Sequence, residues 1–157
     1  MKTLAYFLSI ALVISALACA DKKDPKLEEA GKIHNEAHEI GEALEAQIEG
    51  IDSLKIMLAD KKKTITDAAA LARLDSTSAA LESVQKAFAE WEENIVGVPG
   101  LEHKHAEGEA HNHEHEHKPT PDVTPDQMLE IQQEMKKNIE KIKADLAKAE
   151  EMLKSVL

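Results

Sequence analysis

The chain has 157 residues, enough for one domain, and 30 acidic residues against 19 basic ones give it a formal net charge of −11. This charge makes nucleic acid and anionic lipid surfaces poor partners. The chain also has only one Trp, one Tyr and two Phe, which excludes a base-stacking platform and an aromatic sugar-binding shelf.

The N-terminus has the features of a cleavable export signal. Lys2 precedes an almost purely apolar run over residues 4–17, and small residues lead up to Cys19, the only cysteine. The run is short for a membrane-spanning helix, which needs about 20 residues. We therefore expect a signal peptidase to remove residues 1–18, with an uncleaved membrane anchor as the alternative. Cys19 would then carry a lipid, which also consumes a thiol that has no partner for a disulfide.

The segment around Cys19 is similar to bacterial lipoprotein signals, although Ala16 stands where these signals usually have a large aliphatic residue. Ala20 after the cysteine resembles the pattern of outer-membrane lipoproteins. We expect a lipid-anchored protein of the cell envelope, at the outer membrane, with a tether at 19–25 and a helical domain at 26–157. Loss of Lys2 with the signal leaves 18 basic against 30 acidic residues, a net charge of −12.

Three long stretches carry apolar side chains at alternating steps of three and four, once Gln47 is allowed as a polar interruption in the first, and this is the seam of a coiled-coil-like helix. The first starts at Asp24-Pro25, a favourable helix start, and ends near Lys61–Thr64. The second runs from about Thr66 to Gly97, with residues 75–78 as a candidate break or alternative turn. The seam residues are Ala30, Ile33, Ala37, Ile40, Leu44, Ile51, Leu54 and Leu58 in the first stretch, and Leu74, Thr77, Leu81, Val84, Phe88, Trp91 and Ile95 in the second.

The third stretch has the clearest start, because Thr124 and Gln127 are spaced as a capping box. Two consecutive steps of four, ending at Met135 and Ile139, predict a local stutter. Because amphipathic helices cannot bury their seams alone, we expect an all-α antiparallel three-helix bundle, with a dimerising helical hairpin as the alternative. The seam residues of the third stretch are Met128, Ile131, Met135, Ile139, Ile142, Leu146, Ala149, Leu153 and Val156.

A long His-rich loop is expected at about residues 101–123. Many of its imidazoles recur at every second position, so that neighbours in an extended backbone can converge on one ion. Six acidic residues against two lysines give the loop a local charge of −4, which concentrates cations. The loop therefore predicts binding of zinc, copper or nickel, with a solvated polar linker as the alternative. The candidate ligands there are His103, His105, His111, His113, His115 and His117.

His34 and His38 are four residues apart in the first stretch and so share a helix face. By the predicted seam they lie beside the core, which makes two solvent-facing side chains the simpler interpretation. In an antiparallel bundle, however, the start of the first helix and the His-rich loop lie at the same end. The alternative is therefore that all eight histidines gather there around a metal.

The sequence contains no catalytic motif such as G-x-S-x-G, H-E-x-x-H or a glycine-rich phosphate loop, so we expect a protein that is not an enzyme. Two functions remain open. One is a metal-binding envelope lipoprotein, and the other is a tethered helical interaction protein that binds an envelope partner or itself. In both, the chain contacts the membrane through its lipid anchor.

The chain resembles small helical lipoproteins of Bacteroidota. The resemblance rests on the signal ending at Cys19, on His34 and His38 early in the first helix, and on Trp91 leading to the segment 97–100 before the His-rich tract. It implies a helical fold and no particular activity.

Overall fold

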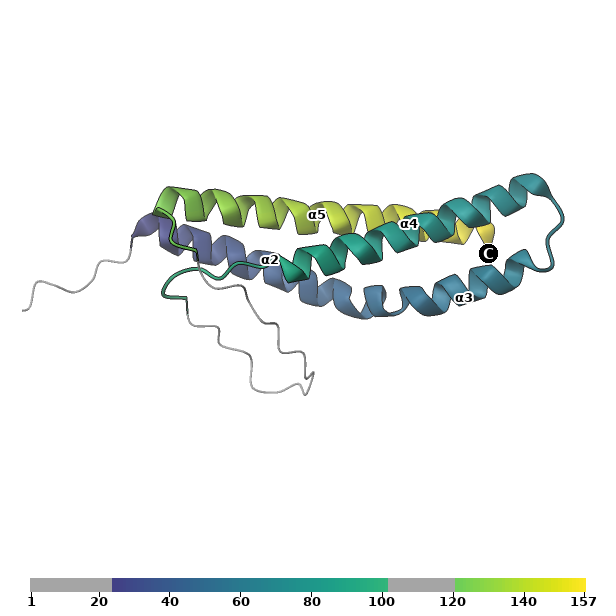
Figure 1. Ribbon diagram of the computed structural model, residues 1–157, viewed down its shortest axis with the longest axis horizontal. Coiled ribbons are helices and arrows are strands. Elements are labelled where there is room, and N and C mark those ends of the chain that lie inside the picture. The colour runs from purple at the N-terminus through teal and green to yellow at the C-terminus, as the bar shows by residue number, and fades with distance from the viewer. Residues whose placement is uncertain (1–23, 102–120) are drawn as a thin grey trace, which may run out of the picture.

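A computed structural model describes residues 24–101 and 121–157 (Figure 1). Cys19 and the six histidines of the tract lie outside these residues. The described parts of the chain form helices and connecting segments without a β-strand, which confirms the all-α prediction, and none of these helices is long and apolar enough to cross a membrane. The helices are α2 (Pro25–Glu49), α3 (Ile51–Lys62), α4 (Ala68–Glu93) and α5 (Pro125–Val156).

The helices lie lengthwise in an elongated bundle (Figure 1). α2 and α3 run in one direction, α4 returns, and α5 runs in the same direction as α2. α5 packs against both α2 and α4, and α3 packs against α4. α2 and α5 therefore begin at the same end of the bundle, which we call the proximal end.

Side-chain caps define where the helices begin. The Asp24 carboxylate accepts a hydrogen bond from the backbone of Lys26, and Asp67 caps the first turn of α4. At α5 the predicted capping box is confirmed, because the Thr124 side chain and the Gln127 side chain each accept from the other residue's backbone N–H.

The first predicted helix is in fact divided at Gly50, which joins α2 to α3 in a right-handed helical conformation. Glycine has a low helix propensity, and this favours an interruption there. The candidate break at residues 75–78 is absent, since α4 continues through it. The hydroxyls of Ser76 and Thr77 instead donate back to backbone carbonyls one turn earlier, at 2.9 Å.

The buried residues correct two of the three seams. The α4 seam is buried as predicted. In α2, however, His34 and Gly41 are buried, whereas Ile33 and Ile40 are only half-buried. In α5 the buried residue is Gln132 rather than Ile131, so the steps alternate regularly between four and three and the predicted stutter is unnecessary. The predicted seams were wrong here because His34 and Gly41 in α2 and Gln132 in α5, none of which is apolar, occupy seam positions.

Candidate functional site

The site centres on a buried polar pair that joins α2 to α5 near the proximal end. His34 exposes 1% of its surface and Gln132 exposes none. The Nδ1 atom of His34 lies 3.0 Å from Oε1 of Gln132. The expectation that His34 faces solvent is therefore wrong, because its hydrogen bond to the facing helix allows the ring to replace an apolar seam residue.

The Gln132 amide has a fixed orientation. Its Nε2 atom donates to the backbone oxygen of Val96 at 2.8 Å and lies 3.5 Å from the sulfur of Met128. Oε1 is consequently the atom that faces His34, and an amide oxygen can only accept. It follows that Nδ1 of His34 carries the proton and donates to Gln132.

His38 lies one turn further along α2 and is half-buried. Its ring centroid is 5.0 Å from that of His34 and 6.4 Å from that of Trp91, and Nε2 of each histidine is buried. The structure therefore brings the two histidines together, as their spacing predicted, and places them against α4 and α5 rather than in solvent.

Trp91 is held in place by contacts with both neighbouring helices. Its indole N–H donates to the backbone oxygen of Met135 on α5 at 3.0 Å. On α2, a Cβ atom at Gly41 would lie only 2.8 Å from two carbons of the Trp91 ring. Gly41 is thus the residue that lets the indole pack directly on the backbone of α2, next to His38.

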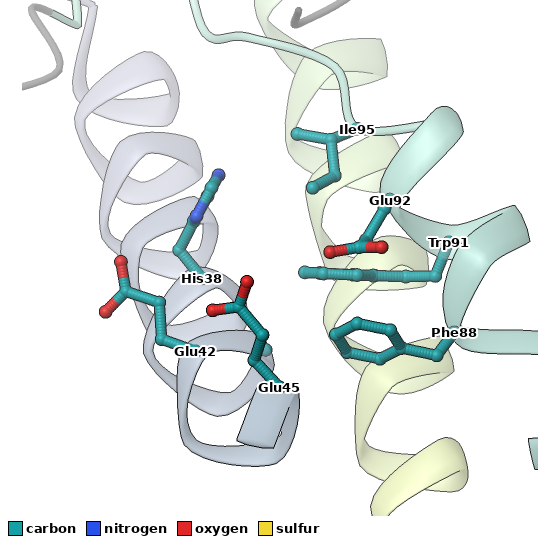
Figure 2. A pocket seen from close by; sticks show the side chains of 8 residues that line it. His38, Glu42, Glu45, Phe88, Trp91, Glu92 and Ile95 are labelled. Atoms are coloured by element: carbon teal, nitrogen blue, oxygen red, sulfur yellow. The ribbon is translucent and has the colours of Figure 1, made fainter. Parts of the chain in front are cut away.

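A small pocket lies between α2 and α4 beside these rings (Figure 2). Its volume is about 20 Å³, which is room for a water molecule or an ion and not for an organic ligand. Figure 2 shows the carboxyl group of Glu92 and the rings of Trp91 and Phe88 extending from α4 toward α2, where Glu45 also lines the pocket. Within the described ranges, however, no three His, Cys, Asp or Glu side chains are arranged to hold a metal.

The residues that flank the His-rich tract pack at the proximal end. Leu101 contacts α2 so closely that a Cβ atom at Gly31 would lie 3.3 Å from its Cδ1 atom. Val123, on the other side of the tract, belongs to the same small apolar cluster as Leu101, which is built around the buried Ala30 and Met128. Both attachment points of the tract therefore lie at the end of the bundle that holds His34.

Two ion pairs join α2 to α5 on the surface around this site. Lys26 pairs with Asp126, and the ammonium of Lys136 lies 2.7 Å from the Glu36 carboxylate. The hydrogen bond to Glu36 raises the pKa of Lys136 above its ordinary value, although partial desolvation opposes the shift. These pairs are exposed, so they contribute to the alignment of the helices more than to stability.

The chain matches no protein-family model, and no characterised protein or solved structure is significantly similar to it. The chemistry of the site residues is therefore the basis for assigning a function. Gln132 and Gly41 are the two site residues that the apolar pattern missed. A strict four-and-three spacing continued backward from Leu44 in α2 and from Ile139 in α5 would have found both.

Proposed function

We propose that the protein is a cell-envelope lipoprotein that binds a divalent transition metal. In this proposal Cys19 anchors the chain, the protein is not an enzyme, and an antiparallel three-helix bundle presents the His-rich tract. Zinc, copper and nickel are the metals that imidazole ligands favour. The metal would be held by His34 or His38 together with histidines of the tract.

The observation that supports this proposal best is the position of the His34–His38 pair relative to the ends of the tract. Leu101 packs against Gly31, which is three residues from His34 and so about 4.5 Å away along the helix axis. His103 and His105 follow Leu101 by two and four residues, a span of at most about 7 to 14 Å. Their imidazoles are therefore within reach of α2.

The pair can supply only part of a metal site. Zinc in proteins is almost always bound by four ligands, or by three and a water molecule, and α2 offers two imidazoles. The remaining ligands must come from other residues, and the tract offers six. The acidic residues Glu42, Glu45 and Glu92, which line the pocket with His38, add a negative field that favours a cation beside His38.

The test is isothermal titration of residues 20–157, which include all described residues, with zinc, copper(II) and nickel. We expect tight binding at about pH 7.5 and loss of binding by about pH 5, because each imidazole must give up its proton and the reference His pKa is about 6.5. A site built from carboxylates would keep much of its affinity at the lower pH.

Two groups of variants divide the site. Replacing His111, His113, His115 and His117 together should remove most of the tight binding, and replacing His34 and His38 should remove a smaller part. Parent-like binding of all three metals by a variant in which all six histidines of the tract are replaced would refute the proposal and leave the tract as a linker.

The second candidate function is a tethered interaction protein. It is favoured by the apolar surface on α3 and at the C-terminus, where Ile56 is 66% and Leu157 62% exposed. Sedimentation of the parent and of Ile56→Glu would test it through self-association. A monomeric parent would remove self-association, and the function would then require a different envelope partner.

A further inference from the structure

We infer that Gln132 is a positioning residue for His34: its amide holds the imidazole in the tautomer with the proton on Nδ1, so that Nε2 is the nitrogen that meets a metal. The tautomer follows from the hydrogen bonds of the metal-free protein. Only the role of Nε2 as a ligand rests on the proposed metal-binding function.

The chain of hydrogen bonds has one consistent direction. The Val96 carbonyl accepts from Nε2 of Gln132, and Oε1 of Gln132 accepts from Nδ1 of His34. Rotating the amide by half a turn would place its oxygen against the Val96 carbonyl, so that two acceptors would face each other. Moving the His34 proton to Nε2 would place the lone pair of Nδ1 against Oε1 with the same result. Both alternatives leave buried polar atoms unsatisfied, which is costly.

The surroundings make this orientation rigid. Gln132 is fully buried, and Val96 lies in the segment after α4 between the buried residues Ile95 and Val98. The sulfur of Met128 lies against the same amide nitrogen one turn earlier on α5. These contacts on its nitrogen keep the oxygen of Gln132 directed at His34.

This geometry is the one that metal-binding histidines use. A ligating imidazole commonly donates its other ring N–H to a fixed acceptor, which sets the tautomer and the ring orientation and raises the basicity of the ligating nitrogen. Loss of such an acceptor typically lowers metal affinity by about 10- to 100-fold. Gln132 is placed to provide that acceptor, although it would not touch the metal.

The test has two readouts and three variants. Nitrogen-15 NMR of the metal-free protein at about pH 8, where a reference histidine is neutral, reports which ring nitrogen of His34 carries the proton. Zinc titration of the same samples reports the zinc affinity and shows which ring nitrogen of His34 changes its NMR signal when zinc binds. The variants are Gln132→Leu, which removes the acceptor, Gln132→Glu, which keeps an acceptor oxygen, and Gln133→Leu as a control at the exposed neighbouring position.

We expect the parent and Gln133→Leu to show a protonated Nδ1 and an unprotonated Nε2 that shifts on zinc binding. Gln132→Glu should also keep Nδ1 protonated, because its remaining oxygen still accepts from this nitrogen. Gln132→Leu should lose this preference and bind zinc about 10- to 100-fold more weakly. If Gln132→Leu does not fold, the parent spectrum and the Gln132→Glu variant still decide the tautomer.

A parent His34 with its proton on Nε2, or zinc binding through Nδ1, would overturn the inference even if zinc binds tightly elsewhere. Absence of zinc binding together with a protonated Nδ1 would instead refute the proposed function and the ligand role of Nε2, while the positioning of the ring by Gln132 would stand. Parent-like zinc affinity and tautomer in Gln132→Leu would also overturn the inference.

Discussion

Replacement of Gly41 by alanine tests how closely α2 and α4 must pack beside His38. The new Cβ atom would lie 2.8 Å from two carbons of the Trp91 ring, well inside van der Waals contact. The indole is large and is fixed on its other side by its hydrogen bond to the Met135 carbonyl at 3.0 Å. The ring can move away from the methyl group only by weakening this bond or by separating the helices.

The magnitude follows from three contributions. Overpacking of a well-packed interior typically costs about 1–3 kcal/mol, and loss of the indole hydrogen bond costs about 1 kcal/mol more. Alanine offsets about 1 kcal/mol through its higher helix propensity. We therefore expect Gly41→Ala to lower the free energy of unfolding by about 1–3 kcal/mol, or the Tm by roughly 4 °C for each kcal/mol.

Gly50→Ala is the matched control, because a Cβ atom there meets only the backbone oxygens of Gln47 and Ala46, at 3.4 and 3.6 Å, and the residue already has helical angles. It should be neutral or should stabilise by up to about 1 kcal/mol. Denaturant unfolding followed by circular dichroism and by the fluorescence of Trp91, the only tryptophan, measures both variants. If Gly41→Ala were as stable as Gly50→Ala with unchanged fluorescence, the close contact between Gly41 and Trp91 would not exist.

Four further outcomes are expected. Cys19→Ala should abolish lipid attachment, which mass spectrometry of membrane fractions would detect as loss of the acyl mass; an unmodified cysteine in the parent would contradict the lipid anchor. Replacing residues 102–118 with a short Gly/Ser linker should keep the helical circular dichroism and most of the Tm, because loop-closure entropy changes slowly with length; loss of cooperative unfolding would show that this segment is structural. Thr124→Ala should cost about 1 kcal/mol in denaturant unfolding, because it removes the cap of α5, and an unchanged midpoint would argue against the cap. Because Glu36 raises the pKa of Lys136 in the folded protein, this pair stabilises the fold at pH values below the ordinary lysine pKa and loses its effect as pH rises through the higher folded value. The small difference in stability between the parent and Lys136→Gln should therefore disappear at alkaline pH and in high salt. A difference that persists under these conditions would have another cause.

Features that depend only on neighbouring residues could be predicted from the amino-acid sequence. The capping box of Thr124 and Gln127 is a local hydrogen-bonded unit, so its spacing alone located the start of α5. The α4 seam was also predicted correctly, because all of its buried positions except Thr77 are apolar. Continuous local signals of this kind are enough to establish an all-α chain.

The residues that form the interior of the site could not be predicted in this way, because they depend on how the helices pack together. The apolar pattern favoured Ile33 over His34, because a buried histidine is costly until a partner is known. That partner, Gln132, lies 98 residues away on α5, and the pairing depends on how two helices align. Gly41 is buried for a similar reason, since the indole of Trp91 from α4 occupies the space that a side chain would need. His34 and Gly41 therefore lie at the centre of the site because of contacts with residues of other helices, which the apolar pattern of α2 does not contain.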